Sequence, residues 1–290
     1  MSSAAQAFFL PADSGSTGQR LCIFHPAQGE LRGRVVYVHP FAEEMNKSRR
    51  MAAMQSRALA AAGFSVLQID LHGCGDSSGD FGDASWQGWI DDVLQAVAWL
   101  RDRDTTHAQA PLWLWGLRAG CLLAVEAASL SGEACNFIFW QPATAGKLLL
   151  QQFLRLKLAS DMLTGSSKGL MDAMRQQLAQ DQSLEIAGYT LAPALARGLE
   201  QSQLTPQQAA PACRVEWFEI NSRDDATLSP VAMQVQAQWN AVSYLLRSHG
   251  VQGPSFWQTT EIEDAPDLIA ATTAALLAHD SESASQVTPV

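Results

Sequence analysis

The chain has 290 residues, 47% of them hydrophobic, and a formal net charge of −10 from 19 basic and 29 acidic residues. This length is enough for one or two domains with a large buried core. The acidic balance excludes general nucleic-acid binding, because that function needs a basic surface.

The five cysteines are odd in number and lie far apart in the sequence. They form no Cys-x-x-Cys pair, so neither a zinc site nor a disulfide framework is indicated, and we expect no metal and no cofactor. Free cysteines fit a reducing compartment. The first ten residues lack the features of a signal peptide, and no apolar stretch approaches the roughly 20 residues that span a bilayer. We therefore expect no membrane span and a cytoplasmic location.

Strands and helices alternate along the first half of the chain. Predicted strands cover residues 21–25 at a sheet edge, 35–38, 64–70, 111–115 and 136–140, and predicted helices cover 47–62, 86–101 and 119–130. Such an alternation predicts a mostly parallel sheet with helices on both faces.

The alternation stops after Trp140. Residues 141–210 contain no convincing strand, and an amphipathic helix is expected at 148–162, so we predict a helical cap over the carboxyl edge of the sheet. Further elements are expected as a strand at 215–220, a helix at 231–249, a strand at 255–259 and a helix at 265–279. The predicted units are therefore a core formed by 1–140 and 211–280, a cap at 141–210 and a disordered tail at 281–290.

Residues 113–120 read Trp-Leu-Trp-Gly-Leu-Arg-Ala-Gly, an apolar strand that runs into a Gly-x-x-x-Gly turn before a helix. This is the layout of the nucleophile elbow of an α/β-hydrolase, in which the middle residue is normally serine. The five-residue pattern alone is weak, but the glycine-rich turn at 70–77 lies about forty residues upstream, as in many such proteins. We predict an α/β-hydrolase fold. At the elbow stands Arg118, which stays protonated and cannot attack a carbonyl carbon.

The other two positions of a catalytic triad are also unusual. Asp225 follows the predicted strand at 215–220 and suits the position of the acid, although a turn or N-cap aspartate is an equal alternative. In the loop after the last predicted strand no histidine occurs before His279, which lies at the end of the closing helix, and Glu261 is expected in its place. If Arg118, Asp225 and Glu261 meet, they form a charge cluster, whose burial costs several kcal/mol unless its geometry is good.

A polar loop, residues 39–50, follows the strand at 35–38. In α/β-hydrolases this loop supplies an N–H group to the oxyanion hole. We therefore assign Phe41, Ala42 and Lys47, together with Leu117 and Ala119 beside the elbow, to substrate or oxyanion binding, and Glu44 to the catalytic candidates. The alternative is a solvated helix N-terminus, because early acids and later bases also suit the helix dipole.

Cys74 is a further candidate nucleophile, because it lies in the glycine-rich turn two residues after His72. An inert thiol is the favoured interpretation, since proximity in sequence does not make a triad.

Taken together, these motifs resemble the α/β-hydrolase-fold group called exosortase A system-associated hydrolase 2. The resemblance covers residues 8–279 and is carried by residues 40–51 (Pro-Phe-Ala-Glu-Glu-Met-Asn-Lys-Ser-Arg-Arg-Met), 70–77, 116–118, 140–142, 152–156 and 185–189. It implies a bacterial host that sorts PEP-CTERM proteins and makes exopolysaccharide. It also implies that the protein is a hydrolase, but it does not identify a substrate. It also implies that an arginine elbow is typical of the group.

Three functions remain open at this point. In the first, the protein hydrolyses an ester, thioester or acyl-sugar; Arg118 stabilises an oxyanion, and Glu44, Asp225 or Glu261 activates water. In the second, a non-catalytic protein binds an anionic acyl or sugar ligand, or a protein partner, through Arg118. In the third, Arg118 and the carboxylates form a structural plug. The sequence leaves the oligomeric state open.

Overall fold

A computed structural model describes residues 4–12, 17–103, 109–162, 169–206, 213–221 and 229–284. Its centre is an eight-stranded sheet in the order β1-β2-β4-β3-β5-β6-β9-β10. β1 and β2 are antiparallel to their neighbours, and the six strands from β4 to β10 run parallel. The strands are β1 (Gln6–Pro11), β2 (Gln19–His25), β3 (Gly33–Val38), β4 (Phe64–Ile69), β5 (Leu112–Leu117), β6 (Cys135–Trp140), β9 (Arg214–Asn221) and β10 (Leu245–Gln252).

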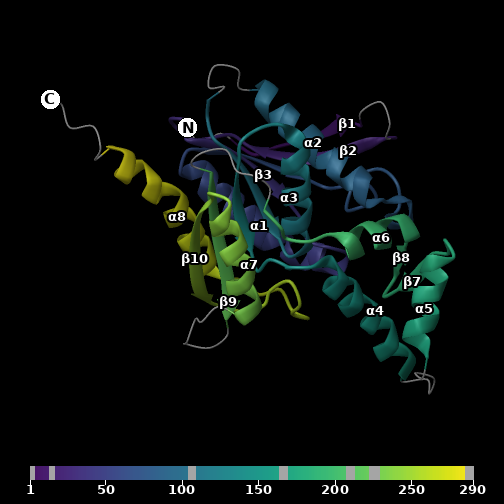
Figure 1. Cartoon of the computed structure of the whole chain (residues 1–290). Helices are drawn as coiled ribbons and strands as arrows, with labels where there is room; N and C mark the ends of the chain where they lie inside the picture. Colours follow the sequence, from purple (N-terminus) through teal and green to yellow (C-terminus); the bar gives the residue numbers. More distant parts are fainter. Residues whose placement is uncertain are drawn as a thin grey trace.

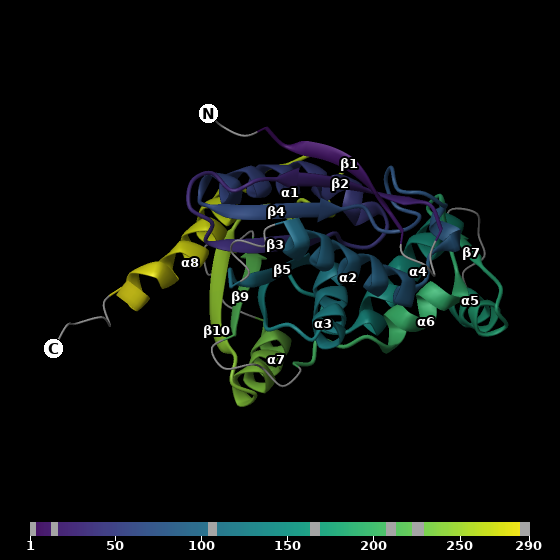
Figure 2. The same ribbon diagram turned by 90° about the horizontal axis from the view of Figure 1, so that it is seen from above.

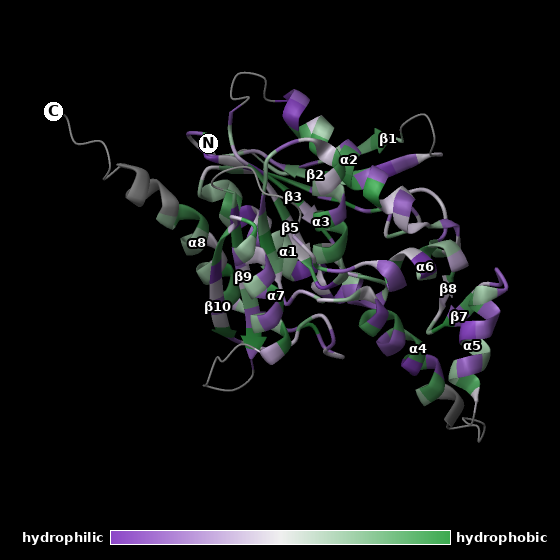
Figure 3. Cartoon of the chain, in the orientation of Figure 1, coloured by the Kyte–Doolittle hydropathy of each residue, from purple (hydrophilic) through white to green (hydrophobic). Residues whose placement is uncertain are grey.

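Helices cover both faces of this sheet, as the sequence predicts. One face is packed by α1 (Glu43–Ala61) and α8 (Pro266–Ala284), and the other by α2 (Trp86–Arg103), α3 (Ala119–Ser131) and α7 (Pro230–Ala241), as Figure 2 shows from above. β3 and β5 are buried along their whole length, because helices lie on both sides of them. Figure 3 shows the central strands as mostly hydrophobic, whereas the helices also carry hydrophilic residues. The α/β-hydrolase fold is thus confirmed.

The segment between β6 and β9 contains α4 (Gly146–Met162), α5 (Leu170–Ala179), a hairpin of β7 (Leu184–Ile186) and β8 (Tyr189–Leu191), and α6 (Pro193–Gln201). These elements gather at one end of the molecule (Figure 1), and α6 packs against α4 and α2. The expectation of no strand at 141–210 is therefore wrong. Ala187 and Gly188 have φ of 51° and 83°, which is the geometry of a two-residue hairpin turn.

Two further expectations about strands are wrong. Residues 21–25 form part of β2, but β1 lies outside it at the sheet edge. The helix predicted at 231–249 is in fact α7 followed by β10, and residues 256–258 form a turn instead of the last strand. β10 is an edge strand with half of its residues exposed, so it lacks the apolar run by which buried strands are recognised.

At the carboxyl terminus, α8 extends to Ala284, so the tail predicted from residue 281 begins inside a helix. Residues 285–290 lie outside the described part of the chain, as does the predicted cap boundary at 210 and 211. Within the described ranges, no helix combines the length and the apolar character that a bilayer crossing requires.

Candidate functional site around Arg118

The turn between β5 and α3 has the strained backbone of a nucleophile elbow. Arg118 has φ of 55° and ψ of −113°, a conformation that L-residues rarely adopt. A Cβ on Gly120 would lie 2.1 Å from the carbonyl oxygen of Val38, and one on Gly116 would lie 2.4 Å from the backbone nitrogen of Cys121. Both glycines are thus required by close backbone contacts.

The Arg118 side chain is held by groups from two other elements. Its Nε donates to Oε1 of Glu44 on α1 at 3.3 Å, and its Nη2 donates to Oε1 of Gln152 on α4 at 3.1 Å. The guanidinium carbon lies 5.9 Å from the ring centre of Trp257, which allows a cation–π interaction. Nη1 makes no hydrogen bond within the described residues. Arg118 is 12% exposed in its side chain, so this cation is largely removed from water.

A second strained position lies in the loop that precedes α1. Ala42 has φ of 49° and ψ of −126° and is the N-cap of α1. The Phe41 ring makes edge-to-face contacts with Phe81, Trp89 and Phe153. The side chain of Leu117 is fully buried in the core, so that residue could face a ligand only through its backbone. The oxyanion roles of Phe41, Ala42, Leu117 and Ala119 stay predictions.

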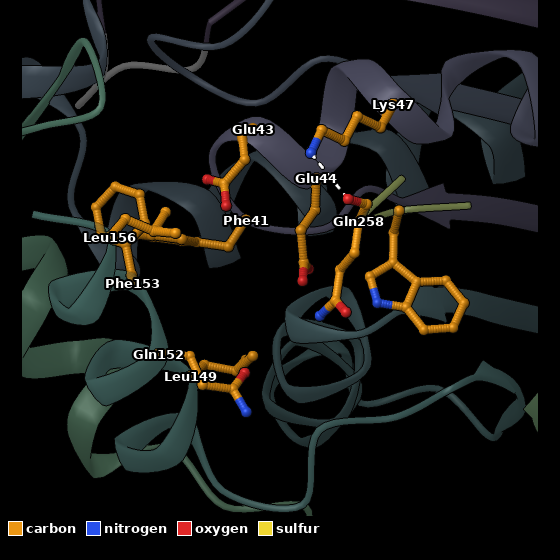
Figure 4. A pocket seen from close by; sticks show the side chains of 10 residues that line it. Phe41, Glu43, Glu44, Lys47, Leu149, Gln152, Phe153, Leu156 and Gln258 are labelled. Carbon is orange, nitrogen blue, oxygen red and sulfur yellow. Dashed lines mark hydrogen bonds between the residues drawn. The ribbon is translucent and has the colours of Figure 1, made fainter. Parts of the chain in front are cut away.

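Next to the elbow, α1 and α4 border a cavity of about 290 Å³. Its lining residues are Phe41, Glu43, Glu44, Lys47, Leu149, Gln152, Phe153, Leu156, Trp257 and Gln258. In Figure 4 the α4 side chains form one wall, and Glu43, Glu44 and Gln258 come from the opposite side. The Lys47 ammonium donates to the carbonyl oxygen of Gln258 at 3.3 Å. The pocket therefore joins an apolar wall to a charged wall.

Burial dominates the electrostatics of the charged wall. It raises the pKa of Glu44 to about 7, against the opposing effect of the Arg118 guanidinium. Burial also raises the pKa of Glu43. Among the described residues, Oε2 of Glu43, Oε2 of Glu44 and Nε1 of Trp257 are buried without hydrogen-bond partners. Unpaired buried polar groups are costly, so these atoms mark places where a ligand can supply the missing bonds.

The structure brings only some of the predicted site residues together. Glu44 pairs with Arg118, and Lys47 lies at the rim of the same pocket. Asp225 lies outside the described residues. Glu261 is exposed, and the carboxylate that pairs with Arg118 among the described residues is Glu44, so the condition of a charge cluster between Arg118 and Glu261 is not met there. The reason is the position of the last strand: β10 ends at Gln252, and the loop after it places Trp257 beside Arg118.

Three contacts fix α1 to its surroundings. Arg50 makes a two-bond ion pair with Asp264 at 2.7 and 2.9 Å, and Arg49 binds Asp70 at 2.8 Å. Together with the bond from Lys47 to Gln258, they hold the loop after β10 and the glycine-rich turn against one helix. The dense charges of residues 39–50 are thus explained by contacts on several sides of α1.

Cys74, the candidate nucleophile in the glycine-rich turn, has an unsuitable environment. Cys74 is buried, and this burial raises the pKa of its thiol far above the ordinary value, so a thiolate is disfavoured. Both ring nitrogens of His39 are bound to the backbone and cannot activate a nucleophile. Its Nδ1 donates to the carbonyl oxygen of Pro40 at 2.8 Å, and its Nε2 accepts from the backbone N–H of Leu71.

Gln152, Trp257 and Gln258 are site residues that the sequence did not reveal as such. Gln152 is a polar residue within the apolar row of α4 formed by Leu149, Phe153 and Leu156. A polar residue on such a face is a signal that could have identified it. Trp257 and Gln258 could be found only by placing β10 correctly.

Comparison with known proteins decides the family. A sequence model described as serine aminopeptidase, S33 (Hydrolase_4) matches residues 29–207, more than half of the chain. The chain belongs to the serine aminopeptidase S33 family. The region that matches this family contains Arg118, Glu44 and Gln152, whereas Trp257 and Gln258 lie beyond it.

Individual relatives agree with this assignment. Human protein ABHD12B is 28% identical over 163 residues, which make up 55% of this chain and 42% of that protein. The chain thus matches less than half the length of this relative. Est1E of Butyrivibrio proteoclasticus, solved with ferulic acid, has a TM-score of 0.64 at 15% identity and covers 97% of this chain and 100% of its own. A soluble variant of the Saccharomyces cerevisiae monoglyceride lipase, solved with a substrate analogue, has a TM-score of 0.63 at 16% identity over 96% of both chains. Likenesses at such identities show the shared fold.

Proposed function

We propose that this α/β-hydrolase-fold protein binds an anionic acyl ligand and does not use serine-hydrolase chemistry. The observation that carries the proposal is the Arg118 guanidinium, which stands where a hydrolase places its nucleophile and is held between Glu44 and Gln152. A guanidinium binds carboxylate and phosphate groups through paired hydrogen bonds but cannot form an acyl-enzyme.

The shape of the pocket supports an amphipathic ligand. Leu149, Phe153 and Leu156 line one wall and suit an apolar chain. Arg118 lines an adjoining cavity of about 220 Å³, which shares Leu149 and Gln152 with this pocket. Nη1 of Arg118 and Nε1 of Trp257, which lies in the wall of the first pocket, are donors without partners in the described residues. An acid group between the Arg118 guanidinium and the Trp257 indole would accept hydrogen bonds from both residues while its chain lies along α4.

Binding of decanoate, a straight-chain carboxylate, tests this function. By isothermal titration calorimetry at pH 7, we expect binding to the wild-type protein and a loss of affinity of about 30-fold or more in Arg118→Gln, because the charged donor is removed. Asp264→Asn, whose side chain lies outside the pocket, serves as a variant with altered charge near α1. Equal affinity of wild type and Arg118→Gln, or no binding to either protein, would contradict the proposal.

A second function is favoured by one specific observation. The pKa of Glu44, raised to about 7 by burial, is suited to a general base at neutral pH. Glu44 could activate water against an ester, thioester or acyl-sugar whose oxyanion Arg118 stabilises. Hydrolysis of p-nitrophenyl esters that is lost in both Glu44→Gln and Arg118→Gln would favour this alternative.

The biological setting is part of the proposal and is supported by the sequence alone. The resemblance of its motifs to exosortase A system-associated hydrolase 2 supports a bacterial host that sorts PEP-CTERM proteins and makes exopolysaccharide, and the widely spaced cysteines support a cytoplasmic location. Deletion of the gene in such a host should reduce surface exopolysaccharide, and an unchanged amount would contradict this setting.

A further inference from the structure

We infer that Glu44 and the ligand compete for the Arg118 guanidinium. The acid group of the ligand replaces the Glu44 carboxylate at Arg118, and Glu44 takes up one proton as it is displaced. This inference rests on the proposed function and adds to it a coupling between ligand binding and protonation.

The contact between Glu44 and Arg118 is weak enough for a ligand to replace Glu44. Glu44 meets Arg118 through a single hydrogen bond of 3.3 Å to Nε, while its second oxygen, Oε2, is buried without a partner in the described residues. The neighbouring Nη2 is bound by a different side chain, Gln152. A guanidinium can offer two parallel donors to one carboxylate, and here two separate acceptors share them. A ligand with both oxygens on one group would satisfy these donors better.

The surroundings decide what happens to the displaced carboxylate. On α1 the charged neighbours of Glu44 are Glu43 and Lys47, and on β3 the Tyr37 phenol lies close enough to interact with it. From the loop after β10, the side chain of Gln258 lies beside it (Figure 4), and hydrogen bonding from this amide opposes the rise in the pKa of Glu44.

Arg118 is the cation that directly pairs with the Glu44 carboxylate. If an anion occupies Arg118, Glu44 loses that pairing and gains a negative neighbour in a buried place, so its protonated form is favoured.

The direction of the pH effect follows from this exchange. In the free protein the pKa of Glu44 is about 7, and in the complex it is higher. Proton uptake on binding is therefore small at pH 6, where Glu44 is already mostly protonated, and approaches one proton at pH 8. Over that range, affinity for an anion falls as pH rises, with a limiting slope of about tenfold per pH unit.

Calorimetry of decanoate binding in two buffers with different ionisation enthalpies measures the proton uptake directly. We expect close to one proton per decanoate at pH 8, and close to none at pH 6, for the wild-type protein. In Glu44→Gln, which keeps an oxygen for Arg118, uptake should vanish and affinity should become nearly independent of pH. Glu126→Gln is the matched control: burial also raises the pKa of Glu126, which accepts from Trp86 away from this pocket.

The outcomes separate the two proposals. Decanoate binding that depends on Arg118 but releases or takes up no proton at pH 8 overturns the exchange and leaves the proposed function intact. Proton uptake that persists unchanged in Glu44→Gln also overturns the exchange. Absence of decanoate binding overturns the proposed function, and the exchange with it. Binding of 1-decanol, a neutral analogue, should show no proton uptake, and uptake with this ligand would contradict displacement by an anion.

Discussion

Nε of Arg118 donates to Oε1 of Glu44 at 3.3 Å and joins the elbow to the first turn of α1, 74 residues away in the sequence. This contact puts a cation and a carboxylate at the place where a serine hydrolase performs its attack. The neighbouring Trp257 lies in the loop after the last strand, the region from which such enzymes supply histidine. The proposal that this site does not use a serine-hydrolase triad rests on these two positions.

The first prediction concerns covalent labelling. Incubation with a fluorophosphonate probe should leave the wild-type protein unlabelled, because Arg118 cannot attack phosphorus and no serine lines the 290 Å³ pocket within the described residues. Ser229, which lines the adjoining cavity, is the N-cap of α7, where its side chain accepts from the N–H of Ala232. Arg118→Ser should also hydrolyse p-nitrophenyl esters extremely slowly, since among the described residues no histidine lines either cavity beside the elbow. Gel fluorescence with a known serine hydrolase as positive control checks the labelling. Clear labelling of the wild-type protein would refute the interpretation of the elbow.

The second prediction concerns the indole N–H of Trp257. Trp257→Phe keeps an aromatic ring near Arg118 but removes the unpartnered Nε1 donor. Decanoate affinity should fall about tenfold or more, the effect of losing a hydrogen bond to a charged group. Trp113→Phe is a matched control, because Nε1 of Trp113 is also buried without a partner in the described residues but lies outside the pocket. Equal losses in both variants would show that the indole N–H of Trp257 has no special role.

The third prediction is the pH dependence of stability that Glu44 imposes. Its folded-state pKa of about 7 lies above the value near 4.3 of an unfolded glutamate, so the folded protein binds this proton more tightly. The resulting stabilisation is fully present below about pH 4 and is lost as pH rises towards 7. Glu44→Gln should gain stability relative to wild type between pH 5 and 8, by up to about 3 kcal/mol.

Urea unfolding of the two proteins at pH 5 and pH 8 measures this difference. Glu261→Gln, which changes an exposed carboxylate, should show no comparable gain. A Glu44→Gln protein whose stability difference from wild type does not change with pH would contradict the raised pKa.

The fourth prediction concerns the close backbone contact at the elbow. Gly120→Ala should destabilise the protein by about 3 kcal/mol, because its new Cβ would meet the Val38 carbonyl oxygen at 2.1 Å and neither backbone can easily move. Gly132→Ala provides the comparison: Gly132 has φ of 69°, but a Cβ added there would have no neighbour within 4 Å, so we expect a cost of about 1 kcal/mol. Chemical denaturation measures both. Similar costs for the two variants would show that the elbow does not need its glycine for close packing.

The fold could be predicted from the sequence where local and long-range signals agree. β3 and β5 are continuous apolar runs, and Gly116 and Gly120 mark the sharp turn between β5 and α3. β10 could not be recognised, because it is a partly exposed edge strand whose pairing with β9 is a long-range property. The three-residue strands β7 and β8 are too short to show a period.

The site was predictable to a similar degree. Glu44 was found because the elbow and the loop after β3 have a known relation in this fold, so one position leads to the other. Glu261 was chosen instead of Trp257 as a direct consequence of the missed β10. Gln152 is recognisable as a polar residue in an apolar row, but its contact with Arg118 was not predictable, since that contact depends on how α4 packs over the sheet. A sequence gives the residue types at a site more readily than their partners from distant elements.

The backbone at residue 118 is fixed without help from its side chain. Its N–H donates to the carbonyl oxygen of Trp140 at 3.1 Å, and its own carbonyl oxygen accepts from the N–H groups of Cys121 and Ala143. The conformation of this turn is therefore held by backbone hydrogen bonds that any residue with a backbone N–H can make, which excludes only proline. Chemistry at this position can be exchanged without rebuilding the scaffold, so a library of residues at 118 should yield folded proteins with different functional groups at one defined point.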